Sequence, residues 1–309
     1  MTDSLPTSPS RVFICEPYHG LGNRLLTIGS SCRLAKKSNA TLAVLWRHDR
    51  NIDVPFHVLF GNEFTTVNSP PTGIDRYDFK MPPAPRAIFS DDNQQIVYFS
   101  GWTHAILAPT DLSVENLNQV SNEIANEIRL LFRYFLSSIK PHLSTVNFPD
   151  TLGIHIRRNT DVEREFAARL SINNFENSTQ PHPELTNWNH LSHDRILDLC
   201  TGALKICGLK SVFISSSDHA LKERLGRSLT QQGLEVKMSL YKYYGSDNQS
   251  IIEAMTDMLL LSRCGCILRS SKTTFSAVAS LIGSRREIVF NDSLRLQPSV
   301  ATILKGNAL

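Results

Sequence analysis

The chain has 309 residues, of which 41% are apolar, and it carries 32 Lys and Arg against 29 Asp and Glu. A chain of this length exceeds the size at which one hydrophobic core usually stops growing, so two domains are expected. The nearly balanced charge argues against nucleic acid or a membrane surface as partner. Any anion-binding site must therefore be local.

The composition of the first residues and the spacing of the cysteines predict a cytoplasmic protein. Residues 1–10 are polar, and no later stretch has the roughly 18 uninterrupted apolar residues of a membrane span. The six cysteines lie mostly in apolar segments without zinc-type CxxC spacing, which favours buried thiols over a disulfide framework. Cys264 and Cys266 should point to the same face of a strand, and they argue little for a metal site.

The pattern of the first half predicts a βαβ unit. A buried strand at 11–15 leads through a glycine turn into a helix at 24–37, and a second strand follows at 41–46. This order predicts a parallel sheet with the turn at the carboxyl ends of its strands, where α/β proteins bind ligands. The other segments are a stretch of irregular loops and short elements (49–92), a strand (95–100) and an amphipathic helix (120–139) that Pro141 closes.

The second half repeats the alternation, so we expect two Rossmann-like domains, 1–145 and 146–309, that face a cleft. The expected strands are 152–156, 211–215, 234–238, 266–269 and 287–290, and the expected helices are one that ends at 207, then 219–232, 250–262 and 274–283. The polar stretch 173–189 is long enough for a lid or for a simply mobile loop, and its composition favours neither.

Two adjacent arginines, Arg157 and Arg158, follow the predicted strand 152–156. A charged side chain next to a buried strand loses contact with water, which costs free energy unless a group of opposite charge lies beside it. A guanidinium contacts phosphate through two parallel hydrogen bonds and stays charged at any working pH, so the pair suits a diphosphate leaving group. The alternative is a salt bridge to Asp161 or Glu163, and the motif alone supports the two interpretations equally.

Two further strand ends carry polar side chains. Residues 269–276 run through Ser and Thr into the predicted helix 274–283, whose first N–H groups either bind an anion or are capped in the ordinary way. Asp218 follows the strand 211–215, where its carboxylate either accepts a hydrogen bond from a sugar or base, or caps the next helix. Taken alone, capping is the simpler interpretation of both.

The glycine turn is Gly20-Leu21-Gly22-Asn23-Arg24, in which the glycines let the backbone approach a ligand closely. It is not a dinucleotide fingerprint, because Leu25 stands where a third glycine is needed and no acidic residue ends the next strand. This disfavours a nicotinamide enzyme. It favours a turn that directs Asn23 and Arg24 toward the cleft.

Three motifs, in order along the chain, resemble those of the fucosyltransferase superfamily of α-1,6-fucosyltransferases, NodZ-type enzymes and protein O-fucosyltransferases. They are GLGNRL with its helix and the strand TLAVLWR, then HIRR at 155–158, and the segment 257–262 continuing to 274–276. Together they cover residues from about 11 to 283. Residues 41–60 look most similar to the NodZ type.

The resemblance implies a GT-B-like fold, GDP-fucose as donor substrate, inversion at the anomeric carbon, and neither a metal nor another cofactor. Arg157 would bind the β-phosphate, and Arg158 would assist it or orient the acceptor, a glycan or a protein. His155 would lie near the nucleotide, and Asn23 with Gly22 in the turn that faces the donor. The remaining donor-binding residues would be Ser271, Thr273, Thr274 and Phe275 around the diphosphate and guanosine, with Asp218 at an acidic site of the family.

The segment after the arginine pair departs from the RRTDK pattern of α-1,6-fucosyltransferases, because Asn159 is inserted and Val162 stands in place of the lysine. A catalytic base would then be Asp161, Glu163 or Glu165. Two alternatives stay open: a related transferase that uses another nucleotide-sugar, and a nucleotide-binding protein without catalysis. A phosphate-ester hydrolase would need a metal cluster or a nucleophile that the sequence does not show.

Overall fold

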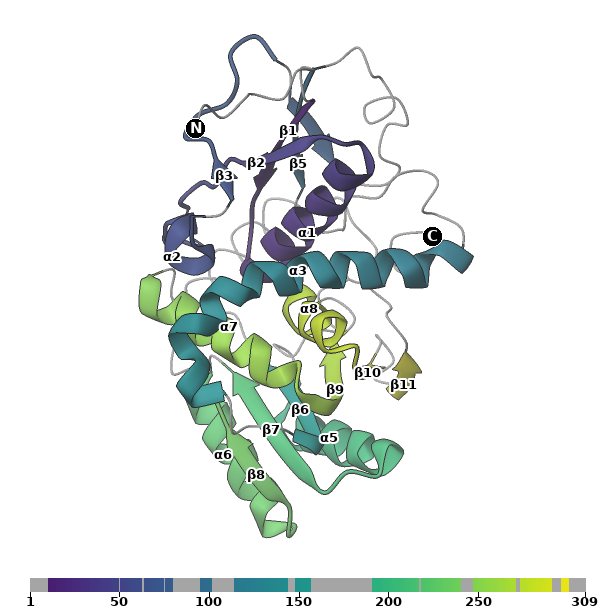
Figure 1. The fold of residues 1–309 in the computed structure, drawn as a ribbon. Coiled ribbons are helices and arrows are strands. Elements are labelled where there is room, and N and C mark those ends of the chain that lie inside the picture. The colour runs from purple at the N-terminus through teal and green to yellow at the C-terminus, as the bar shows by residue number, and fades with distance from the viewer. Residues whose placement is uncertain are drawn as a thin grey trace, which may run out of the picture.

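The computed structural model describes residues 11–49, 51–62, 64–74, 76–79, 95–101, 114–143, 148–156, 191–216, 218–239, 247–270, 273–290 and 296–299. These residues form two sheets with helices packed on them (Figure 1), one sheet from each half of the sequence. The predicted α/β class with parallel sheets is therefore confirmed.

The first sheet has five parallel strands in the order β3-β2-β1-β5-β4. Their bounds are β1 Val12–Pro17, β2 Thr41–Val44, β3 Thr65–Thr66, β4 Arg76–Phe79 and β5 Ile96–Gly101. Strand β1 occupies the centre because its apolar run VFIC can be buried on both faces. The strand order reverses between β1 and β5.

The second sheet has the order β11-β10-β9-β6-β7-β8, and its described pairs are parallel except β10 with β11. The bounds are β6 Phe148–Ile156, β7 Ser211–Ser216, β8 Glu235–Met238, β9 Cys264–Ser270, β10 Arg286–Phe290 and β11 Leu296–Ser299. The chain builds outward from β6 to β8 and then returns to place β9 on the other side of β6. The carboxyl ends of β6 and β9 thus form a topological switch point, the usual place for a ligand in such sheets.

A layer of helices lies between the two sheets (Figure 1) and joins them through one hydrophobic core. Residues of the first half such as Leu25, Ile28 and Ile128 pack in that core with Met258 and Val278 of the second half. The helices are α1 Leu21–Lys37, α2 Phe56–Phe60, α3 Val114–Leu143, α5 His193–Cys207, α6 His219–Gln231, α7 Asn248–Leu261 and α8 Thr274–Gly283. None of the helices in the described ranges combines the length and apolar character needed to cross a bilayer.

Two helices differ from their predicted bounds. Helix α1 begins at Leu21 instead of residue 24, so the glycine turn is the helix's own first turn, with Gly20 as the N-cap. Helix α3 continues through Pro141 to Leu143, although the proline was expected to close it. A proline removes one backbone hydrogen bond, and the helix ends two residues later.

The prediction that Cys264 and Cys266 share a face of β9 is wrong. Cys264 packs in the core between the two sheets, whereas Cys266 packs in the second core, with residues of α5 and α6. The pairing of β6 with β9 shifts in register between Phe148 and Leu152. Four steps along β6 thus lie opposite two steps along β9, and the regular alternation of side chains is interrupted at this irregularity.

A buried ion pair joins β9 to β10 below the switch point. Arg269 Nη2 lies 3.0 Å from Glu287 Oε2, and the two side chains are 4% and 1% exposed. Because both charges have lost their water, each depends on the other.

We therefore expect Glu287→Ala to lower the free energy of unfolding by about 3–5 kcal/mol, since the Arg269 charge then stays buried without this carboxylate. Glu235→Ala is the matched control, because Glu235 pairs with Lys237 at the surface of β8 and should contribute little. Urea denaturation measures both variants. Similar losses in the two would contradict the argument.

Candidate functional site

Two candidate donor-binding residues meet at the switch point. His155 is the penultimate residue of β6, and Phe275 is the second residue of α8, which follows β9. Their rings are stacked, with centroids 4.3 Å apart and planes inclined by 23°. His155 is 8% exposed. The structure thus brings together two residues that the sequence placed in different motifs.

Helix α1 meets the start of α8 at Gly22. A Cβ atom at position 22 would lie 2.8 Å from the backbone N of Phe275 and 2.8 Å from the carbonyl C of Thr274. No side chain fits in that space, so the contact requires glycine. Because Gly22 and Thr274 both lie in the first turns of their helices, two positive helix ends converge at this point. An anion placed there would be stabilised by both.

One side chain at these helix starts, Asn23, leaves hydrogen-bonding capacity for a ligand. The N-cap residue Thr273 does not accept a hydrogen bond from a backbone N–H of α8, and its Oγ1 lies 2.8 Å from the side-chain oxygen of Ser276 in that helix. Capping by Thr273, the simpler expectation for 269–276, is therefore wrong. Asn23 Oδ1 is buried and accepts no hydrogen bond from the residues that the structure describes. A buried amide oxygen in this situation suits a ligand hydroxyl.

Arg24 is part of the fold and does not point into a cleft, which corrects the prediction for the glycine turn. Its side chain is fully buried and lies 4.4 Å from the centre of the Trp46 ring. The guanidinium donates to His19 O at 2.9 Å and Arg47 O at 2.7 Å, and Nη2 lies 2.8 Å from Asp49 Oδ2. Burial lowers the pKa of Arg24, and Asp49 opposes that effect. Arg24 thus ties the turn to the loop after β2.

Asp218 caps α6. Its Oδ1 accepts a hydrogen bond from Leu221 N at 2.9 Å, so the capping interpretation is confirmed, and a contact with nucleotide stays a prediction. The neighbouring Ser216 donates to Ile156 O at 2.8 Å and accepts from Asp218 N at 3.1 Å. These bonds hold the ends of β6 and β7 together beside His155.

The remaining predicted residues Arg157, Arg158, Asp161, Glu163 and Ser271 lie outside the described residues. In the sequence, the arginine pair follows directly after Ile156 at the end of β6, and Ser271 follows Ser270 at the end of β9. Their roles stay predictions.

Asp257 of α7 is a buried carboxylate next to the site to which the sequence analysis assigned no role. It is 2% exposed, and its Oδ2 accepts a hydrogen bond from Ser215 Oγ at 2.7 Å. Burial raises the pKa of Asp257 to about 7, against the opposing effects of hydrogen bonds from Ser239 and Ser215 and of the Lys222 charge. Ser215 pairs in register with His155, so Asp257 supports the strand beside it. A lone acid within the apolar run of 254–261 was the sequence feature that could have identified it.

The raised pKa predicts how stability depends on pH. Below about pH 4, Asp257 is protonated in both the folded and the unfolded chain; as the pH rises to about 7, only the folded chain keeps the proton. The stability that Asp257 contributes therefore falls over this window. We expect the stability of Asp257→Asn, relative to the unmodified protein, to increase between pH 4 and 7 by up to about 4 kcal/mol. Denaturation at several pH values measures this, with Asp198→Asn on the exposed face of α5 as control; parallel curves would refute it.

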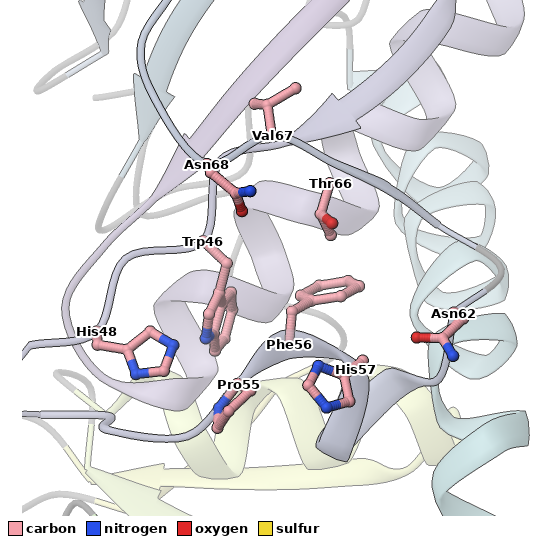
Figure 2. Close-up of a pocket in the computed structure, with 9 residues that line it drawn as sticks. All are labelled: Trp46, His48, Pro55, Phe56, His57, Asn62, Thr66, Val67 and Asn68. Carbon is pink, nitrogen blue, oxygen red and sulfur yellow. The ribbon is translucent and has the colours of Figure 1, made fainter.

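A pocket of about 190 Å³ lies where β2 and β3 end (Figure 2). Trp46 and Phe56 form its aromatic wall, and Trp46 Nε1 is held by Val54 O at 2.8 Å. The other lining residues are His48, Pro55, His57, Asn62, Thr66, Val67 and Asn68. Amide, hydroxyl and imidazole groups dominate, without Asp, Glu, Lys or Arg, and this lining suits a ligand rich in hydroxyls better than a phosphate. The pocket could not be predicted from sequence patterns, because its lining residues come from three separate segments of the chain.

Comparison with known proteins finds matches among solved structures, whereas no protein-family model and no curated protein matches the chain. A structure of POFUT1 in complex with GDP is 15% identical, with a TM-score of 0.53, over 91% of this chain and 96% of that one. A mutant of Arabidopsis thaliana FUT1 in complex with GDP is 14% identical, with a TM-score of 0.57, over 92% of this chain and 71% of that one.

The chain has the fold of these fucosyltransferases. A structure of POFUT1 in complex with GDP-fucose also matches, at 14% identity and a TM-score of 0.50, over 91% of this chain and 96% of that one. The resemblance drawn from three short motifs therefore extends to the fold of nearly the whole chain.

Proposed function

We propose that the protein transfers fucose from GDP-fucose to a hydroxyl of a glycan or protein acceptor, with inversion and without a metal ion. The observation that carries the proposal is the convergence of two helix N-termini at Gly22, next to the stacked pair His155 and Phe275. The structures of POFUT1 and FUT1 that share the fold hold GDP or GDP-fucose, which supports the choice of donor.

The donor would lie across the starts of α1 and α8. The first N–H groups of the helices and the positive ends of their dipoles attract the diphosphate. The ring of Phe275, which stacks on the buried His155, would offer an apolar surface for the guanine base. Asn23 Oδ1, which is buried without a partner among the described residues, would accept a hydrogen bond from a hydroxyl of the ribose.

Transfer then requires that charge on the departing diphosphate be stabilised. As the bond between the anomeric carbon and the β-phosphate oxygen breaks, the sugar becomes oxocarbenium-like and the electron pair stays on GDP. Arg157, next in sequence to the end of β6, neutralises that charge together with the helix ends, and Arg158 assists it. Asp161, Glu163 or Glu165 takes the proton of the acceptor hydroxyl as the new bond forms.

In this proposal the acceptor binds to the amino-terminal half of the chain. The pocket of Figure 2 lies at the carboxyl ends of strands in the first sheet, and neutral hydrogen-bonding side chains line it. Such a lining fits one sugar unit of a glycan acceptor and gives no advantage to the charged donor. Donor and acceptor would therefore be recognised by different chemistry, the donor by the starts of α1 and α8 and the acceptor by neutral side chains after β2 and β3.

Asn23→Ala tests the donor site separately from the fold. Since Asn23 Oδ1 bonds to no described residue, its loss should change the free energy of unfolding by no more than about 0.5 kcal/mol. Loss of one hydrogen bond to the ligand should weaken GDP binding about tenfold. Titration calorimetry with GDP measures this, with Asn122→Ala on the exposed face of α3 as the matched control. Unchanged GDP affinity in Asn23→Ala would remove Asn23 from the site.

Arg157→Ala should abolish fucose transfer, because the charge on the departing diphosphate then loses its stabilising partner. The melting temperature should stay unchanged, because the role proposed for this arginine lies in transfer and not in packing. Arg157→Lys should also be severely impaired, since an ammonium cannot make the two parallel contacts of a guanidinium. The measurement is GDP release from GDP-fucose with a mixture of oligosaccharides, with Arg195→Lys on α5 as control. Full activity in Arg157→Ala would refute the mechanism. GDP binding without any turnover in the unmodified protein would favour a binding protein.

A further inference from the structure

Cys207 and Cys266 lie with their sulfur atoms 2.8 Å apart. Cys207 is the last residue of α5, and Cys266 lies on β9 in the core that α5 covers. The sulfur atoms of a disulfide are 2.03–2.05 Å apart, so an approach of about 0.8 Å would allow the bond. We propose that Cys207 and Cys266 form a disulfide when the protein meets an oxidant of the disulfide class, such as glutathione disulfide.

Exposure makes Cys207 the most accessible of the six thiols. Cys207 is partly exposed, whereas Cys266 and the other four thiols are buried. The other four are Cys15, Cys32, Cys200 and Cys264, and burial raises the pKa of each of them, which makes them poor nucleophiles. An oxidant in solution therefore reaches Cys207 first, and Cys266 is the thiol in contact with it.

The reaction is a pair of thiol–disulfide exchanges. The Cys207 thiolate attacks one sulfur of glutathione disulfide, whose S–S bond breaks and releases one glutathione thiolate. The Cys266 thiolate then attacks the Cys207 sulfur of the mixed disulfide and releases the second glutathione. The protein loses two protons and two electrons, and glutathione disulfide gains them. Burial raises the pKa of Cys266, so the second exchange should be the slower one and should accelerate as the pH rises.

The bond would strengthen the carboxyl-terminal half without touching the donor site. It would link positions 59 residues apart and so close a loop that contains β7, α6, β8 and α7, which restricts the unfolded chain. Cys266 lies four residues before Ser270, the end of β9, which is about 13 Å along a strand. The disulfide therefore stabilises the fold and leaves GDP binding unchanged. The structure agrees with the prediction of buried thiols, since all six cysteines are free and five of them are buried, and the bond would form only on oxidation.

The test compares the full chain after incubation with glutathione disulfide and after incubation with dithiothreitol. Free thiols are blocked with N-ethylmaleimide, and peptides from a non-reducing digest are identified by mass spectrometry. We expect one cross-linked pair that joins positions 207 and 266, and a melting temperature several degrees higher in the oxidised protein. Cys207→Ser and Cys266→Ala should lose both effects, whereas Cys32→Ala, which removes a buried thiol of the other half, should keep both.

Two results would overturn the proposal. One is that both thiols are alkylated after oxidation, or that another pair is linked. The other is that the oxidant raises the melting temperature equally in Cys207→Ser and the unmodified protein, because the stabilisation would then not come from this bond. GDP affinity measured on the same oxidised sample should equal that of the reduced sample, and a loss would refute the claim that the bond leaves the donor site unchanged.

Discussion

Helices α1 and α8 touch at their first turns, and the space between them at Gly22 is too small for any side chain. This contact sets the positions of the other candidate residues. It holds the amino-terminal half against the start of α8, where Phe275 stacks on His155. It also leaves two positive helix ends side by side, an arrangement that is unfavourable by itself and favourable around an anion. A fold that brings these ends together is suited to a diphosphate.

The contact is maintained by packing on both sides of it. The core between the sheets includes α1, α3, α7 and α8, and α3 crosses the boundary between the halves (Figure 1). Arg129 of α3 donates to Ile282 O at 2.7 Å and to Ser284 Oγ at 3.0 Å, at the carboxyl end of α8. Helix α8 is therefore held at both ends, by Gly22 at its start and by Arg129 at its finish. A donor bound there would meet a site whose shape is already set.

Features that depend on neighbouring residues along the chain could be predicted from the sequence. Period and turn residues located most strands and helices, including β6, α8 and their polar ends, and the order of motifs led to the fold. Features that depend on contacts between distant segments could not be derived in that way. The burial of Arg24 against Asp49 and Trp46 is one such case. Cys264 and Cys266 lie in different cores, at a point where the pairing of β9 with β6 is irregular, and no pattern within β9 records that irregularity. Asp257 and the pocket of Figure 2 likewise combine segments that are remote in sequence.

A crystal structure of the protein in complex with GDP would show directly whether the converging starts of α1 and α8 form the donor site. We expect the diphosphate to lie at the starts of α1 and α8, within hydrogen-bond distance of backbone N–H groups there, with the base next to Phe275. A nucleotide bound elsewhere, with the starts of α1 and α8 empty, would contradict it. In that case the convergence of the two helix ends would be a feature of the fold alone.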